Sequence, residues 1–369
     1  MKCALIEYNS YHGETLPTLL YILNRLNISV DVYCSQKVVR NNPFIYAAGL
    51  SYSQRDCDGL FFKLWVARRQ FRDYDFLLLN SLEPKEILQK AAEVPIPIVA
   101  VIHNGNLINT DLDFARFFAV SNRKPLVLAK HVSNFVSKAV AIQWISPVFF
   151  GQVKARKVHD QTNVLFCVQG NLDFDRRNYV SLLDAIGQLT SDGVRSFRVM
   201  IVGRSEARHY LIFREQVRDR KVDSFFEFSN GELTYQDYYG SMTTASFLLP
   251  LVDRTSPPYG AYFLEKITSS VQLAIGLGIV PVIHMELARL YEIEEQSVAY
   301  RDGGLTDALK RALNVNAEAL ESMRNGLVSK KETLLNESIA NMRDTLEDIG
   351  LTPPRVKVVA TNRRFSIGS

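Results

Sequence analysis

Short apolar runs alternate with helical segments along most of the chain, and this alternation constrains the fold more than any other feature. The chain opens with an apolar run at 3–8, continues with leucines at helical spacing over 16–26, and returns to a strand-like run at 29–34. A strand, a helix and a strand in this order predict a parallel sheet with a right-handed crossover. Later strand-like runs extend the sheet, at 76–79, 98–102 and 125–128.

The same order of elements starts again in the second half, after a basic and polar stretch at 151–162. Helical patterns lie between its strand-like runs, which are 163–168, 197–202, 225–228, 245–251 and 279–284. At roughly 100–200 residues per domain, a chain of 369 residues has room for two domains. We therefore predict an α/β protein with two facing, doubly wound domains. The predicted parts are a domain at 1–150, a linker at 151–162, a domain at 163–349 and a tail at 350–369.

The composition excludes several other classes of protein. Hydrophobic residues make up 47% of the chain and charged residues 22%, which are ordinary values for a globular protein. No apolar run reaches the ~18 residues that a membrane helix needs, and Glu7 interrupts the first apolar run. We therefore expect no signal peptide and a cytoplasmic location. A net charge of +4 is too small to predict nucleic-acid binding, and four cysteines without a CxxC pair predict reduced thiols.

Polar residues follow several of the predicted strands, at the edge where an open parallel sheet binds ligands. In the first half, His12, Gly13 and Glu14 follow the first strand, and His103 follows the run at 98–102. In the second half, the residues that follow strands are Gly170, Asn171, Gly203, Arg204 and Ser229. Two facing sheets with such loops would form a cleft between the domains, and we expect the ligand there.

Two segments of the second half combine positive charge with the start of a helix. Arg177 is one of two arginines that enter a predicted helix, and Lys266 precedes good N-cap residues of another, which are Thr268, Ser269 and Ser270. The free N–H groups and the positive dipole end of a helix suit a diphosphate, and a lysine adds a point charge. The alternative is an ordinary pair of helix starts with solvated basic residues.

Several nucleotide and metal motifs are missing or weak. Neither half has a GxGxxG after its first strand, and the chain has no Walker GxxxxGK[ST] sequence, which argues against NAD and P-loop sites. The segments 111–113 and 173–175 match a DxD pattern, but that pattern has low specificity. We therefore predict neither a metal ion nor a cofactor.

In the order of its motifs, the second half resembles the C-terminal domain of GT-B glycosyltransferases, which have two facing Rossmann-like domains. The resemblance covers about residues 160–290. It rests on Gly170 with the basic pair at 176–177, the strand and glycine at 199–203, the segment at 226–250, and the glycine and proline pattern at 276–283.

The resemblance implies transfer of a sugar from a nucleotide-sugar, with the donor nucleotide on the second domain and the acceptor on the first. Arg177 matches a basic residue that contacts the donor phosphate, whereas Asn171 stands where the family has another arginine. The family's pair of glutamates is not intact, because Glu265 and Gln272 lie near the expected positions at a shorter spacing. His103 resembles a histidine that faces the donor sugar.

The stereochemistry of such a reaction stays open at this point. An inverting enzyme needs a base for the acceptor hydroxyl, and His12, Glu14 and His103 are the candidates. In a retaining enzyme the leaving phosphate takes that proton, and positive charge beside the diphosphate carries catalysis.

The expected partners are a nucleotide-sugar, UDP-linked, and a saccharide or lipid-linked saccharide acceptor in surface-polysaccharide synthesis. The aromatic and basic segment at 61–72 suits contact with an anionic membrane, and the alternative is a helix packed in the first domain. Two other functions stay open. One is a catalytically silent protein that binds a glycan or a partner, and the other is a UDP-sugar epimerase of the same architecture.

Overall fold

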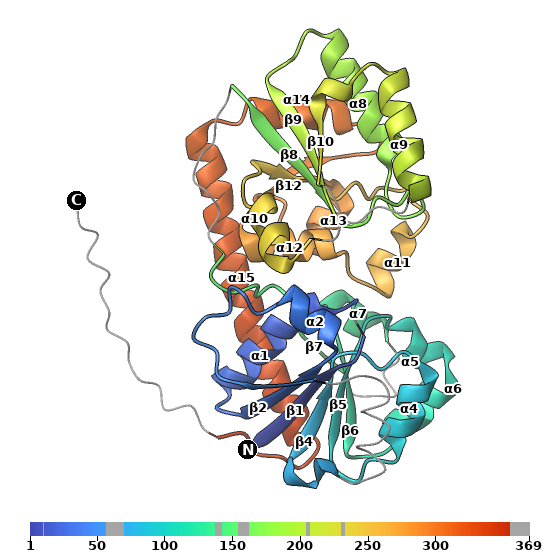
Figure 1. Ribbon diagram of the computed structural model, residues 1–369, viewed down its shortest axis with the longest axis vertical. Coiled ribbons are helices and arrows are strands. Elements are labelled where there is room, and N and C mark those ends of the chain that lie inside the picture. Colours follow the sequence, from blue (N-terminus) through green and yellow to red (C-terminus); the bar gives the residue numbers. More distant parts are fainter. Residues whose placement is uncertain are drawn as a thin grey trace, which may run out of the picture.

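Two parallel sheets, one in each half of the chain, organise the structure (Figure 1). The computed structural model describes residues 1–9, 11–56, 70–136, 142–153, 162–203, 207–229 and 233–354. Throughout these ranges the paired strands of both sheets run parallel, as the alternation of strands and helices predicts. We call the two units the first domain and the second domain.

The first domain has the strand order β3-β2-β1-β4-β5-β6-β7 in its sheet. The strands are β1 (Lys2–Glu7), β2 (Ser29–Cys34), β3 (Ser53–Asp56), β4 (Phe76–Leu79), β5 (Ile98–Ile102), β6 (Arg123–Val127) and β7 (Gln143–Trp144). The helices are α1 (Leu16–Arg25), α2 (Gln36–Asn41), α4 (Lys85–Ala92), α5 (Asn106–Thr110), α6 (Leu112–Phe118) and α7 (Lys130–Phe135). The order reverses between β1 and β4, and such a switch point opens a crevice at the carboxyl ends of the strands.

The second domain repeats this arrangement, with the strand order β10-β9-β8-β11-β12-β13. The strands are β8 (Val164–Gln169), β9 (Phe197–Val202), β10 (Phe226–Phe228), β11 (Phe247–Leu248), β12 (Val280–His284) and β13 (Val298–Tyr300). The helices are α8 (Tyr179–Ser191), α9 (Ala207–Asp219), α10 (Tyr235–Met242), α11 (Tyr259–Leu264), α12 (Ser269–Leu277), α13 (Met285–Leu290), α14 (Leu305–Leu313) and α15 (Ala317–Glu347). The switch point here lies between β8 and β11.

Both faces of each sheet are buried under helices, so the central strands are apolar except at their ends, as in β1, which begins with Lys2 and ends with Glu7. In β1, Ala4 and Ile6 contribute to one core cluster, while Cys3 and Leu5 contribute to the cluster on the opposite face. This alternation follows from the period of two residues in a strand. The described cysteines are buried and free, as the absence of a CxxC pair predicts; they are Cys3, Cys34 and Cys167.

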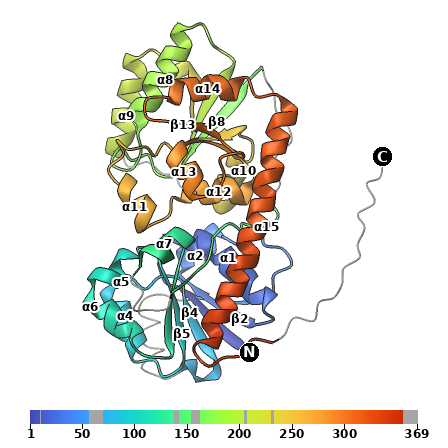
Figure 2. The ribbon, with the colours of Figure 1, turned by 180° about the vertical axis from the view of Figure 1, so that it is seen from behind.

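The long helix α15 belongs to both domains. Its first part places Leu320 and Leu327 in the core of the second domain, whereas its last turns place Met342 and Leu346 in the core of the first. The two views show the helix running along one side of both sheets (Figures 1 and 2). Among the described residues, no helix is both long enough and apolar enough to cross a membrane.

Hydrogen bonds also join the end of α15 to the first domain. The Ser146 N–H donates to Ser338 Oγ at 2.9 Å, and the Asn341 side chain donates to the Trp144 carbonyl at 2.8 Å. The predicted boundaries group residues 163–349 as one domain, so they do not describe this return of the chain.

Other predicted elements agree with the structure to different degrees. The helix α12 occupies Ser269–Leu277, the limits that its capping residues predict. The strand predicted over 245–251 is confined to Phe247–Leu248, and the rest is a loop. Most of the aromatic and basic segment at 61–72 and of the linker at 151–162 lies outside the described residues.

We expect Met342→Ala to destabilise the protein by about 2–4 kcal/mol, because it removes a fully buried side chain from the first domain's core. Chemical unfolding followed by circular dichroism measures this change. Glu337→Ala, at an exposed position of the same helix, is the control and should change stability by less than about 0.5 kcal/mol. Equal effects of the two substitutions would contradict the anchoring of α15 in the first domain.

Candidate functional site

The loops at the carboxyl ends of both sheets meet between the domains. Tyr235 of α10 approaches the loop after β1, where its hydroxyl lies 3.5 Å from Glu14 Oε2. The loop after β5 reaches the second domain as well, since the Gly105 N–H donates to the Glu265 carbonyl at 2.8 Å. The loops that the sequence predicts to face a ligand therefore meet at this point.

A buried polar network lies at the switch point of the first domain. Glu7, at the end of β1, is fully buried, and its carboxylate accepts hydrogen bonds from the Asn80 amide and, at 2.8 Å, from the Ser81 hydroxyl. Burial raises the pKa of Glu7 to about 8, against the lowering effect of these donors. Asn80 also donates to the His12 carbonyl at 3.0 Å, so the network fixes the loop that carries His12 and Glu14.

His12 and His103 stack on each other at the mouth of this network, with 3.6 Å between the ring centroids. His103 Nε2 lies 2.7 Å from the Asn80 carbonyl, and the Glu83 carboxylate accepts the His103 backbone N–H at 2.6 Å. A carbonyl only accepts, so Nε2 of His103 carries the hydrogen and Nδ1 is the acceptor. Burial lowers the pKa of both rings to about 4, and both are therefore neutral at pH 7.

Glu14 is the candidate whose protonation changes near neutral pH. It is partly buried between the first domain and α10, and burial raises its pKa to about 7. The hydrogen bond from Tyr235 acts in the opposite direction and lowers the pKa. The structure thus brings all three predicted catalytic candidates to one loop cluster.

Close backbone packing at the switch point of the second domain requires glycine. Gly170 and Gly203 have φ angles of +90° and +150°. A Cβ atom on Gly203 would lie 2.3 Å from the Gly170 carbonyl oxygen, and one on Gly170 would lie 2.9 Å from the Arg177 guanidinium. These glycines therefore let two loops and one arginine share a small space.

Arg177 ties the end of β8 to the start of α12. Its guanidinium donates to the Gln169 carbonyl and, at 3.2 Å, to Ser270 Oγ. The Gln169 side chain donates to Ser269 and Ser270 at 3.1 and 2.8 Å, and its oxygen accepts from Tyr238 of α10. Some of the N–H groups of Arg177 are thus bonded within the protein, and these bonds help to position the N-terminus of α12.

The N-terminus of α12 has unused polar groups. Thr268 occupies the N-cap position without a side-chain capping bond, so free N–H groups remain in the first turn. Gln272 is only 3% exposed, and within the described part of the chain its Oε1 has no hydrogen-bond partner. Lys266 lies two residues before the cap residue and is partly buried; no hydrogen bond or ion pair links its ammonium group to another described residue. Free N–H groups and an unpaired cation suit an anionic ligand.

Two other residues that the sequence predicts to bind the ligand in the second domain, Asn171 and Ser229, form their hydrogen bonds elsewhere than at the N-terminus of α12. Ser229 stabilises the loop after β9, because its hydroxyl accepts the Gly203 N–H at 3.1 Å and donates to the Ile201 carbonyl at 3.2 Å. Asn171 is exposed, and its carbonyl accepts from the Tyr179 hydroxyl at 3.4 Å. Arg204 lies outside the described residues.

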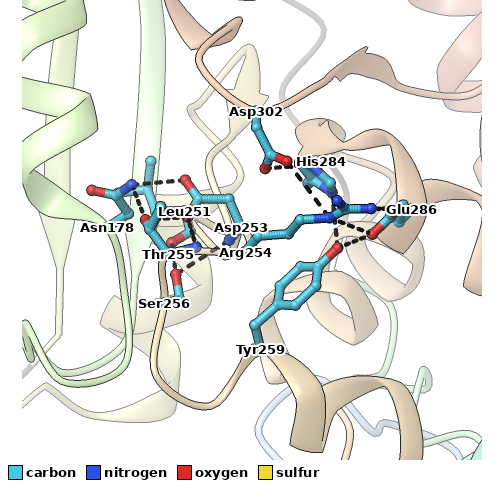
Figure 3. Close-up of polar contacts among 10 residues, drawn as sticks. All are labelled: Asn178, Leu251, Asp253, Arg254, Thr255, Ser256, Tyr259, His284, Glu286 and Asp302. Atoms are coloured by element: carbon cyan, nitrogen blue, oxygen red, sulfur yellow. Dashed lines mark hydrogen bonds and ion pairs between the residues drawn. The ribbon is translucent and has the colours of Figure 1, made fainter.

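The loop between β11 and α11 carries a polar cluster that the sequence interpretation missed (Figure 3). Asp253 is buried and accepts hydrogen bonds from the Asn178 amide at 2.8 Å and from the Thr255 hydroxyl at 2.6 Å. Leu251, in the same loop, has a φ angle of +54°, which is strained for a branched side chain. The signal in the sequence that points to Asp253 is its place just after the strand-like run at 245–251.

A second part of this cluster follows β12 and β13. The Arg254 guanidinium and the Tyr259 hydroxyl both donate to Glu286, and the hydrogen bond from Arg254 is the main cause that lowers the pKa of Glu286 to about 2 (Figure 3). His284 is buried, with Nε2 3.0 Å from Asp302 Oδ1. The contacts of Arg254 and Tyr259 with Glu286 brace the loop and leave neither of these charges free. Within the described residues, His284 Nε2 makes no hydrogen bond.

One of the two DxD segments lies beside a histidine. Ligand atoms of Asp173, Asp175 and His209 lie within 4.8 Å of one another. Asp173 already pairs with Arg176 at 3.2 Å, and exposed acidic groups are common without an ion. We therefore assign no metal to this cluster.

Neither a family model nor a curated protein matches the chain. Among solved structures, it is similar to a glycosyltransferase from Rickettsia africae, with a TM-score of 0.62 and 9% identity over 94% of this chain and 98% of that one. It is also similar to Anabaena Alr3699/HepE in complex with UDP and glucose, with a TM-score of 0.63 and 12% identity over 94% of this chain and 99% of that one.

A further similar structure is WaaG, a glycosyltransferase involved in lipopolysaccharide biosynthesis. The TM-score is 0.55 and the identity 12%, over 94% of this chain and 100% of that one. With two parallel sheets in Rossmann order, these matches show that the chain has the GT-B fold, as the motif series predicts.

The raised pKa of Glu7 predicts that stability falls as pH rises. Between its unfolded pKa near 4.5 and about 8, the folded chain binds a proton at Glu7 that the unfolded chain has lost, so Glu7 alone should contribute a loss of about 3 kcal/mol from pH 5 to pH 8. The lowered pKa values of His12 and His103 act in the opposite direction. Urea unfolding at several pH values measures the slope. Glu7→Gln should flatten it whatever its effect on absolute stability, and an unchanged slope would contradict the assignment to Glu7.

Proposed function

We propose that this protein is a glycosyltransferase that transfers a sugar from a nucleotide-sugar, UDP-linked, to a saccharide or lipid-linked saccharide acceptor. The observation that carries the proposal is the arrangement across the cleft. An unsatisfied helix N-terminus with Lys266 lies on one side, and neutral histidines with a carboxylate of pKa about 7 lie on the other. The glycosyltransferases with the same fold support it.

In this proposal, the donor diphosphate binds at the first turn of α12. The free N–H groups, the helix dipole and the Lys266 ammonium stabilise the negative charge that builds up on the leaving diphosphate. With this positive charge at the diphosphate, the proposed chemistry needs no metal ion. The carboxamide of Gln272, with its unpartnered Oε1, would accept a hydrogen bond from a donor hydroxyl.

The acceptor binds on the first domain, and Glu14 is the base that removes the proton from its hydroxyl. A base works best when its pKa lies near the operating pH, and among the three candidates Glu14 meets this condition. His12 and His103, with pKa values of about 4, are too weak as bases at pH 7 and serve as neutral hydrogen-bonding groups. This assignment corresponds to an inverting reaction.

Synthesis of surface polysaccharide and contact with a membrane are the wider setting that we propose. The similarity to a structure described as involved in lipopolysaccharide biosynthesis supports the setting. The segment predicted to contact the membrane lies largely outside the described residues, so that contact stays a prediction.

Lys266→Ala should weaken UDP binding about tenfold, because it removes a cation beside the diphosphate. Arg177→Ala should weaken it as well, since α12 loses the guanidinium that places Ser270. Isothermal titration calorimetry with UDP measures both effects. Arg176→Ala is the matched control, because Arg176 is the neighbouring arginine and its guanidinium pairs with Asp173 at the surface. Unchanged UDP affinity in both test variants would contradict the donor site.

Glu14→Gln should abolish transfer from a UDP-sugar and leave UDP affinity unchanged. In the wild type, activity should fall as pH drops below about 7, since protonated Glu14 cannot accept a proton. Tyr235→Phe removes a hydrogen bond that lowers the pKa of Glu14, so this fall should move to higher pH.

A radiometric transfer assay across pH 5–9 would test these expectations. Full activity of Glu14→Gln would contradict the base assignment and favour the retaining alternative. UDP-sugar binding without turnover would favour the catalytically silent alternative, and NMR of the UDP-sugar would reveal epimerisation.

A further inference from the structure

The segment that carries Lys266 is held in place by the other domain. This segment, residues 265–268, connects α11 to α12. Gly105 donates its N–H to the Glu265 carbonyl at 2.8 Å, and His131 Nε2 lies 3.2 Å from the Lys266 carbonyl. Ile267 packs against the core clusters of the first domain. The backbone of the segment thus docks on the first domain, whereas α12 continues into the second.

His131 is suited to act as a neutral hydrogen-bond donor in this contact. A carbonyl only accepts, so Nε2 of His131 carries the hydrogen. Burial lowers the pKa of His131, while hydrogen bonds to the backbone of Lys266 and Tyr262 act in the opposite direction. The ring also meets Tyr291 edge to face at a centroid distance of 5.4 Å, and the Tyr291 hydroxyl accepts the Thr268 N–H at 3.3 Å. His131 therefore contacts the backbone of Lys266 directly, and the N-cap residue Thr268 only through Tyr291.

Gly105, whose N–H donates to the Glu265 carbonyl, packs closely against α7 within the first domain. A Cβ atom there would lie 2.7 Å from Val132 Cγ1 and 3.1 Å from Val136 Cγ2, both in or beside α7. The same atom would also face the Glu265 carbonyl oxygen at 3.5 Å. A side chain at Gly105 would therefore crowd α7, the helix that carries His131, while the Glu265 carbonyl lies at an ordinary contact distance.

We infer that His131 is a positioning residue for the donor site: its N–H holds residues 265–268 so that Lys266 and the first turn of α12 bind a nucleoside diphosphate. His131 belongs to the first domain and acts through backbone and Tyr291 contacts, not by touching the donor. Donor affinity and the docking of the two domains are then coupled. Coupling is reciprocal, so nucleotide binding in turn favours the docked arrangement. The inference rests on the proposed function, because it names how that site is assembled.

The test measures UDP affinity by calorimetry in the wild type, His131→Leu and His131→Gln. Leucine removes the N–H and should weaken UDP binding about fivefold. Glutamine keeps an N–H donor and should restore most of the affinity. Asn134→Ala, at an exposed position of the same helix, is the control and should bind like the wild type. Small-angle scattering of His131→Leu should show a larger radius of gyration that saturating UDP reduces.

The outcomes separate this inference from the proposed function. If the wild type binds no nucleoside diphosphate, both the proposed function and the inference are wrong. If the wild type binds UDP and His131→Leu binds it equally well, the inference alone is wrong. Equal weakening in the leucine and glutamine variants would also overturn it, because loss of the N–H would then not be the cause. Rescue by glutamine supports it. If the leucine variant fails to fold, His131→Phe, which keeps a planar ring without an N–H, takes its place in the calorimetry and in the scattering, and wild-type UDP affinity in that variant overturns the inference.

Discussion

The apolar anchoring of α15 in both cores holds the carboxyl ends of the two sheets opposite each other. Each sheet alone presents only loops and helix N-termini at that edge, and neither could enclose a ligand. With the domains fastened by Leu327 at one end and Met342 at the other, the loop after β1 faces α10, and the loop after β5 meets the segment before α12. The candidate site is a product of this geometry, since its charged groups come from both domains.

The alternation of apolar strands and amphipathic helices was sufficient to predict two parallel α/β domains. Local signals fix such elements: α12 begins where N-cap residues stand and ends at Gly278, whose φ of +67° suits a left-handed cap. The apolar periodicity of a helix does not show which domain its apolar face packs against. The last turns of α15 have an apolar stripe like the first turns, but Met342 packs in the other domain. For this reason the boundary at 349 follows chain order and not packing.

In the candidate site too, the sequence predicted which residues lie at the site but not which partners they contact. Residues that follow strands were selected correctly as neighbours, because the carboxyl ends of parallel strands meet at one edge; His12 and His103, far apart in sequence, stack there. Roles were harder to predict. Arg177 has the charge of a phosphate ligand, yet its guanidinium is partly occupied by Gln169 and Ser270. Such hydrogen-bond partners within the protein depend on distances between side chains that are remote in sequence. The spacing of residues in a motif gives no information on these distances.

Because α15 returns to the first domain, that domain cannot complete its fold until the C-terminal part of the chain has been synthesised. Ser146 and Ser338 share a hydrogen bond although they are 192 residues apart in the chain. While the first domain leaves the ribosome, its core lacks Met342 and Leu346, and apolar surface on α1 and β7 stays uncovered. Incomplete cores of this kind attract chaperones and tend to aggregate. The first domain is thus synthesised first but completed last. Truncation near the C-terminus would therefore destabilise the N-terminal domain.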